Sequence, residues 1–127
     1  MNATVEISVG ELIDKYSILC IKELYIRDGD KLQNVYEEKR KLAETCVPLL
    51  QNNKLNLLFL DLYSVNKKLW EIEDKIRKEE KDMNFGENFV ALARDVYHTN
   101  DHRFDLKSKI NNLMGSEIIE EKSYEEY

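Results

Sequence analysis

The stretch LNLLFLDLYSVNKKLWEIEDKI, residues 55–76, decides the fold class of this chain. Its apolar side chains recur at alternating steps of three and four residues, a spacing that places them on one face of an α-helix and is typical of a coiled-coil seam. The members of this series are Leu55, Leu58, Leu62, Val65, Leu69, Ile72 and Ile76. The pattern predicts one long helix over residues 54–81.

A second series with the same spacing predicts a partner helix over residues 86–114. Its members are Phe89, Leu92, Val96, Thr99, Arg103, Leu106, Ile110 and Leu113. A single antiparallel register pairs the two series member by member around a turn centred on Asn84. In that register Ile72 neighbours Val96, and Leu58 neighbours Ile110. We therefore expect a coiled-coil-like hairpin.

The first half of the chain predicts two more helices, over residues 8–27 and 31–50. Ser8 and Glu11 have the spacing of a capping box, in which the serine caps the helix and the Glu11 carboxylate turns back toward it. Asp30 and Gln33 are the expected cap pair of the next helix, and Pro48 is expected to kink or end it.

The second hairpin has its own boundary signals. Asn84 and Glu87 are the expected cap pair of its second helix, and Gly115 is expected to end that helix. Two antiparallel hairpins predict an all-α fold, an up-down-up-down four-helix bundle. We expect a single domain over residues 1–115, followed by an acidic C-terminal tail over residues 116–127.

Composition and charge exclude several classes of function. Of 127 residues, 35% are charged and only four are Gly and one is Pro, which favours helices over a many-turned β-fold. The net charge is −6, and the five Glu and one Lys of residues 117–127 carry four of those six charges. The body is nearly neutral, so neither a nucleic acid nor a membrane surface is an expected partner.

The chain has no sign of export or of a thiol site. No basic and apolar leader opens it, and its purely apolar runs, such as Leu57–Leu60, are far too short to span a membrane, so we expect a cytoplasmic protein. Cys20 and Cys46 lie on apolar helix faces without the spacing of a zinc or redox site. Both are expected to be buried free thiols.

Two polar residues interrupt the otherwise aliphatic seam, and they mark the candidate site. Thr99 and Arg103 occupy adjacent layers, and a guanidinium near a core needs a partner. We expect a carboxylate or an amide within hydrogen-bonding reach of Arg103. The candidate polar site comprises Glu11, Asp14, Lys15, Asn66, Trp70, Tyr97, Asn100, Asp101 and Arg103. These residues form either a network that fixes helix register or a ligand pocket, and a concave cavity lined by them would favour the pocket.

Other acidic and imidazole pairs give weaker signals. Glu71 and Asp74 have a spacing that holds a divalent cation in all-α nucleotide pyrophosphohydrolases, but the second acidic pair on a neighbouring helix is missing. His98 and His102 lie four residues apart without an evident third ligand. We expect no metal and no cofactor.

Four motifs carry a family resemblance that spans nearly the whole chain. They are GELIDK at residues 10–15, LWEIED at 69–74, VYHTND at 96–101 and the ending GSEIIEEKSYEEY at 115–127. With these motifs the chain resembles an uncharacterised family of small bacterial and phage proteins, a domain of unknown function. The resemblance implies a single intact domain and supplies no catalytic residues.

Two classes of function remain. The first is a non-enzymatic cytosolic bundle that acts through contacts with a protein partner or with itself as a homodimer, because packing signals dominate the sequence. The second is an enzyme or small-ligand-binding protein that uses the polar site around Arg103. Its chemistry would be pyrophosphohydrolase-like or chorismate-mutase-like.

Overall fold

The computed structural model describes all residues, 1–127, and contains four helices and no strand. The helices are α1 (Val9–Tyr25), α2 (Gly29–Leu49), α3 (Asn53–Lys81) and α4 (Glu87–Met114). The all-α prediction is confirmed. Helix periodicity placed every boundary within about two residues, which is within the usual uncertainty of such boundaries.

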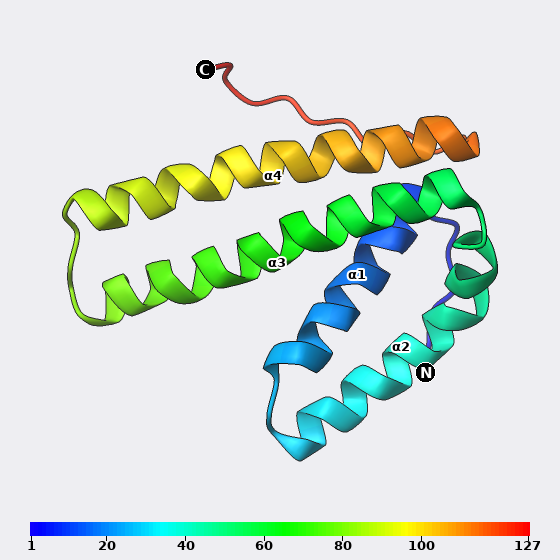
Figure 1. The fold of residues 1–127 in the computed structure, drawn as a ribbon, viewed down its shortest axis with the longest axis horizontal. Coiled ribbons are helices and arrows are strands. Elements are labelled where there is room, and N and C mark those ends of the chain that lie inside the picture. Colours follow the sequence, from blue (N-terminus) through cyan, green and yellow to red (C-terminus); the bar gives the residue numbers. More distant parts are fainter.

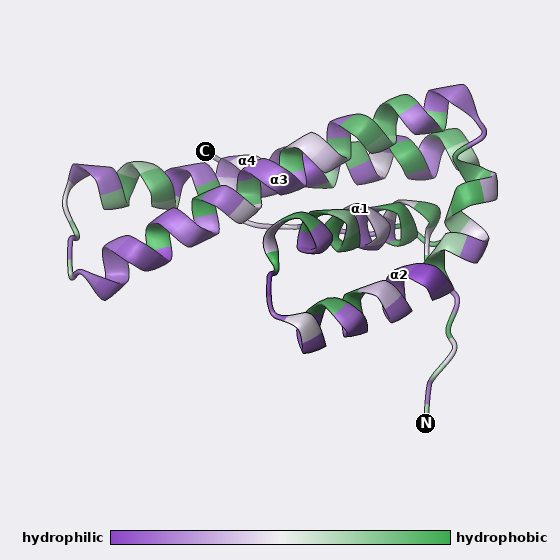
Figure 2. Cartoon of the chain, turned by 60° about the horizontal axis from the view of Figure 1, so that its bottom comes forward, coloured by the Kyte–Doolittle hydropathy of each residue, from purple (hydrophilic) through white to green (hydrophobic).

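The two longest helices, α3 and α4, form a hairpin against which the shorter hairpin packs (Figure 1). Helix α1 contacts α3 and α4, whereas α2 packs mainly against α1. The turn between α3 and α4 projects well beyond α1 and α2, and the C-terminal segment runs back along α4 (Figure 1). Hydrophobic and hydrophilic residues alternate along each helix, as Figure 2 shows by hydropathy and as amphipathic helices require.

The first two helices begin at side-chain caps. The Ser8 side chain accepts a hydrogen bond from the Glu11 amide, as predicted. The predicted Asp30 cap is wrong: α2 begins at Gly29, and Asp28 accepts from the backbone amide of Lys31. Both aspartates flank the glycine, and only the earlier one has the extended backbone of an N-cap residue.

The long hairpin has one predicted boundary and one unexpected boundary. Gly115 ends α4 in the left-handed conformation, with φ +65°, which confirms the expectation. Helix α4 begins after Gly86 without any side-chain cap, so the predicted Asn84 cap is wrong. The turn lies between Lys81 and Glu87, and is therefore centred on Asn84. The exact pairing of the two apolar series stays a prediction.

The core lies where α1 and the end of α2 meet the open end of the long hairpin, formed by the start of α3 and the end of α4. Its buried members come from all four helices and include both apolar series: Ile13, Cys46, Leu55, Leu62, Val65, Leu106 and Ile110. This placement leaves the projecting turn of the hairpin outside the main core, with Met83, Phe85 and Val90 exposed. None of the four helices is both long and apolar enough to cross a membrane.

Both cysteines are free, and we expect them to react slowly in the folded protein. Burial raises the pKa of the Cys46 thiol to about 11 and also raises that of Cys20. Because only the thiolate attacks, a disulfide reagent at about pH 8 should modify both residues far more slowly than in denatured protein. Rapid modification of native protein, followed by absorbance, would contradict the buried placement of Cys46.

Candidate functional site

Arg103 of α4 forms a bidentate ion pair with Asp14 of α1. Its Nε and Nη2 lie 2.9 and 2.5 Å from the two carboxylate oxygens, and the Asp14 side chain is only 1% exposed. The hydrogen bonds to Asp14 raise the pKa of Arg103 despite its partial burial. The expectation of a carboxylate or an amide within hydrogen-bonding reach of Arg103 is therefore confirmed, and the partner is the carboxylate of Asp14.

Asn66 of α3 joins the same pair. Its Nδ2 donates to Asp14 Oδ1 at 2.9 Å and to Ser17 Oγ at 2.8 Å, and Ser17 Oγ donates to the Asp14 carbonyl at 2.7 Å. One buried carboxylate thus connects α1, α3 and α4. Ser17 was not among the predicted site residues, although it lies one turn beyond Asp14 on the buried face of α1.

Lys107 extends this polar cluster by one turn of α4. Its side chain is 7% exposed, and Nζ lies 2.8 Å from both Glu11 of α1 and Glu120 of the C-terminal segment. Burial alone would lower the pKa of Lys107, but hydrogen bonds to these two carboxylates raise it. The Glu11 carboxylate was expected to turn back toward Ser8, but it accepts a hydrogen bond from Lys107 instead. The buried Lys107 ammonium needs a negative charge beside it to offset its loss of water.

The helices α1 and α4 approach closely at Gly10. Its backbone amide donates to Asn111 Oδ1 at 2.7 Å. A Cβ at Gly10 would lie 2.6 Å from the Lys107 carbonyl oxygen and 2.7 Å from Asn111 Oδ1. Because Gly10 has no side chain, the backbones of α1 and α4 can approach closely here. This approach places Glu11 and Asp14 of α1 against α4.

The C-terminal segment, residues 116–127, lies along α4 and is held there by side chains. Ser116 Oγ accepts from the Val9 amide at 3.0 Å. Lys122 Nζ lies 2.5 Å from Asp101 Oδ1, and it also lies 5.7 and 5.5 Å from the ring centroids of Phe104 and Tyr124. This ammonium is held by one carboxylate and two aromatic faces, which is a typical cation–π arrangement.

Tyr127 makes a third contact between the C-terminal segment and α4, after those of Glu120 with Lys107 and of Lys122 with Asp101. The Tyr127 hydroxyl donates to Asp101 Oδ2. Its ring meets those of Tyr97 and His98 edge to face, with centroid distances of 5.2 and 4.8 Å. The segment therefore runs antiparallel to α4, from Lys107 back toward Tyr97 (Figure 1).

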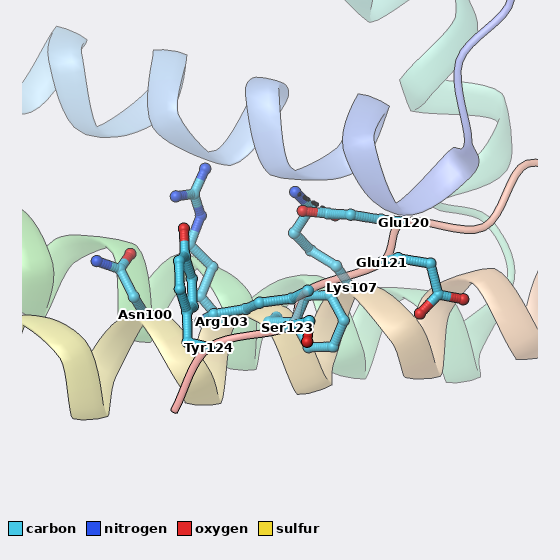
Figure 3. A pocket seen from close by; sticks show the side chains of 9 residues that line it. Asn100, Arg103, Lys107, Glu120, Glu121, Ser123 and Tyr124 are labelled. Carbon is cyan, nitrogen blue, oxygen red and sulfur yellow. Dashed lines mark ion pairs between the residues drawn. The ribbon is translucent and has the colours of Figure 1, made fainter. Parts of the chain in front are cut away.

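Two adjoining cavities open between α4 and the C-terminal segment. The first is about 480 Å³, and Figure 3 shows Arg103 and Lys107 extending from α4 toward α1, with Tyr124 and Glu120 of the C-terminal segment beside them. The second is about 940 Å³ and is lined by aromatic and acidic side chains, among them Tyr97, Asp101 and Tyr127. Along α4, the first cavity with the cations Arg103 and Lys107 thus adjoins the second cavity with its acidic and aromatic side chains.

The nine predicted site residues form two groups and two separate residues. Glu11, Asp14, Asn66 and Arg103 belong to the buried cluster, whereas Tyr97, Asn100 and Asp101 line the cavities beneath the C-terminal segment. Lys15 is half exposed, 3.8 Å from Glu11. Trp70 stacks on Tyr25 with centroids 5.7 Å apart and lines a separate cavity beside α1.

One residue of the Glu71–Asp74 pair and one of the His98–His102 pair contact a tyrosine side chain. Glu71 accepts a hydrogen bond from the Tyr25 hydroxyl at 2.6 Å, and His98 contacts the Tyr127 ring. No group of three His, Cys, Asp or Glu side chains converges in the way a metal site requires.

The contacts of Asp101 should make docking of the C-terminal segment depend on pH. Hydrogen bonds from Lys122 and Tyr127 lower the pKa of Asp101 below 3.8. A lowered folded pKa means that the contribution is present above the unfolded pKa and is lost as pH falls through the folded value. The segment should therefore detach in acid, which the chemical shifts of the Tyr127 ring would report. An Asp101→Asn variant should show no such acid transition, and an unchanged transition would contradict this role.

Comparison with known proteins gives a family without an assigned activity. No curated protein and no solved structure matches the chain. A family model described as a family of unknown function, DUF6165, matches residues 3–127. The match includes α1 to α4 and the whole C-terminal segment. The chain belongs to the DUF6165 family.

Proposed function

We propose that the protein is a cytosolic, non-enzymatic helical bundle that acts through protein contacts. We further propose that the surface of α4 that carries Tyr97, Asp101, Phe104 and Lys107, called here the groove along α4, receives an extended segment of its partner. The observation that carries this proposal is the way the C-terminal segment lies in that groove. It has no regular secondary structure, and side chains hold it at Lys107, Asp101 and Tyr97.

The groove selects a pattern of charges along an extended chain. Lys107 takes a carboxylate, and the Asp101 and Phe104 pair takes an ammonium two residues later. Tyr97 and His98 then take an aromatic ring. A partner segment with this order of groups fits the groove, and the chain's own C-terminal segment fills it when the partner is absent. A second copy is one source of such a segment, because exchange of identical elements builds dimers at low cost.

The test uses the full chain with its own segment weakened. In a variant carrying Lys122→Ala and Tyr127→Ala, the groove should be free to bind a synthetic peptide of residues 116–127. Unsubstituted protein should bind the same peptide at least about tenfold more weakly, because the tethered segment competes at millimolar effective concentration. Isothermal titration calorimetry measures both affinities.

A matched control peptide isolates the charge order. Glu120→Lys together with Lys122→Glu keeps the composition but places each charge against a like charge on α4. This peptide should not bind. Equal affinity for both peptides, or no binding of either to the weakened variant, would contradict the proposal. Sedimentation of the unsubstituted protein separates a partner in trans from a second copy.

A further inference from the structure

One face of α4 carries the groove and continues beyond it toward the hairpin turn. The residues of this face recur at alternating steps of three and four, which places them in a single stripe along the helix. From the groove toward the start of α4, the stripe comprises Lys107, Phe104, Asn100, Tyr97, Ala93 and Val90. The first four of these residues lie beneath the C-terminal segment, because they line the two cavities between that segment and α4.

Residues 116–127 do not cover the other two members of the stripe. The ring of Tyr127 contacts that of Tyr97, about one helical turn before Ala93 and about two turns before Val90. Val90 is 53% exposed, and Ala93 is half-buried. Only α3 lies alongside this part of α4, because the hairpin turn projects beyond α1 and α2 (Figure 1). The stripe therefore continues uncovered past the end of the groove.

The uncovered part of α4 is apolar on every side. Five consecutive apolar residues, FVALA at Phe89–Ala93, complete more than one turn of helix. Leu92 is the one buried member, whereas Val90 and Ala91 are exposed. A helix that packs on one side only is expected to be polar on its other side. The exposed side of this turn therefore has the composition of a contact surface.

We propose that the partner segment continues past the position of Tyr127 and places aliphatic side chains on Ala93 and Val90. This extension rests on the proposed function, since the same groove receives the rest of the segment. One extended segment is the occupant because the stripe is continuous with the face on which the C-terminal segment already lies. Ala93 carries only a methyl group, so a larger aliphatic side chain can approach α4 between Val90 and Tyr97.

The path of the C-terminal segment sets the spacing of these aliphatic groups. Between its contacts with Lys107 and Tyr97 the segment advances from residue 120 to residue 127, while α4 rises by about 15 Å. At the resulting pace of about 2 Å per residue, a segment reaches Ala93 about three residues after its aromatic ring and Val90 about five residues after it. These two positions point to the same side of an extended chain, whose side chains alternate.

The test uses three synthetic peptides and the variant carrying Lys122→Ala and Tyr127→Ala, in which the groove is free. The first peptide is residues 116–127, and the other two extend it by the sequence SSLSL or SSSSS. The leucine extension should bind about tenfold more tightly than the serine extension, because two aliphatic side chains leave water. Isothermal titration calorimetry measures the three affinities.

The unextended peptide separates this inference from the proposed function. If it binds and the two extended peptides bind equally well, the aliphatic extension is overturned and the proposed function stands. If none of the three peptides binds, both are overturned.

Two further substitutions, each added to the same variant, locate the contact. Val90→Ser should reduce the advantage of leucine to less than about threefold and leave the affinity of the unextended peptide unchanged. Val90→Thr, which keeps the side-chain shape, replaces it if circular dichroism shows that the serine variant does not fold. Leu60→Ser is the matched control, at a position of α3 that is 51% exposed, and should keep the full advantage.

A tenfold advantage that persists in a folded Val90 variant would place the leucines elsewhere and overturn the proposal. Sedimentation of the protein without the other substitutions tests a second copy as the occupant. Self-association that Val90→Ser abolishes would assign the uncovered stripe to a second copy and would also overturn the proposal.

Discussion

Replacement of Arg103 by alanine is expected to lower the free energy of unfolding by about 3 to 5 kcal/mol. The Asp14 carboxylate is 1% exposed, and Arg103 supplies two of its three side-chain hydrogen bonds. Without the guanidinium the carboxylate stays buried with only Asn66 to compensate it, and that uncompensated charge is the main cost. Urea unfolding followed by circular dichroism measures the change.

Arg77→Ala is the matched control. Arg77 also pairs with a carboxylate, that of Glu73, but the Arg77 side chain is 78% exposed, so its loss should cost less than about 1 kcal/mol. A double variant with Arg103→Met and Asp14→Leu removes both charges and should recover much of the loss. If Arg103→Ala unfolds at the parent's urea midpoint, the Arg103–Asp14 pair contributes nothing to stability. That result would contradict the burial of an ion pair between α1 and α4.

Gly10→Ala is expected to destabilise the protein by about 2 to 4 kcal/mol, a sum of overpacking and a lost buried hydrogen bond. The added Cβ would lie 2.6 Å from the Lys107 carbonyl oxygen, which is backbone and cannot rotate away. Helix α1 must then move off α4, which breaks the hydrogen bond from Gly10 to Asn111. Thermal and urea unfolding of the variant measure this loss.

Gly29→Ala separates this contact from the general effect of replacing a glycine. Gly29 is the first residue of α2, and a Cβ there meets nothing within 4 Å. Its substitution should leave stability unchanged or raise it by up to about 1 kcal/mol, through the lower entropy of the unfolded chain. A Gly10 variant as stable as the Gly29 variant would mean that α1 and α4 do not approach as closely as described.

The sequence predicted the helices well because their signals are local and repeated. The apolar residues of α3 and α4 recur at a strict spacing over many turns, and such a period is compatible with helices and hardly with any other secondary structure. The predictions of N-caps at Asp30 and Asn84 were wrong for a different reason. Aspartates flank Gly29 on both sides, and which of them caps α2 depends on how the chain enters the helix. Helix α4 begins after Gly86 with no side-chain cap at all.

The candidate site was predictable only where polarity conflicted with the apolar pattern. Arg103 interrupts an aliphatic series, so the need for a partner was evident, and Asp14 was among the candidates. Lys107 was missed because it lies beside that series, where a lysine usually reaches solvent. Its burial depends on Glu120, which comes from a segment without any periodic pattern.

The role of the C-terminal segment could not be derived from its composition. Its five glutamates and single lysine resemble a solvated acidic tail, and nothing local indicates what it contacts. Its placement depends on two pairs across the fold, Lys107 with Glu120 and Asp101 with Lys122. Such contacts join residues that only the folded hairpin brings together.

A nuclear Overhauser spectrum of residues 1–127 tests most directly whether the C-terminal segment occupies the groove along α4. The rings of Tyr127 and His98 have centroids 4.8 Å apart, and those of Tyr127 and Tyr97 5.2 Å apart. The structure predicts cross-peaks between the protons of these rings at neutral pH, and their loss in Asp101→Asn. Random-coil shifts for residues 117–127 without cross-peaks to α4 would contradict the account.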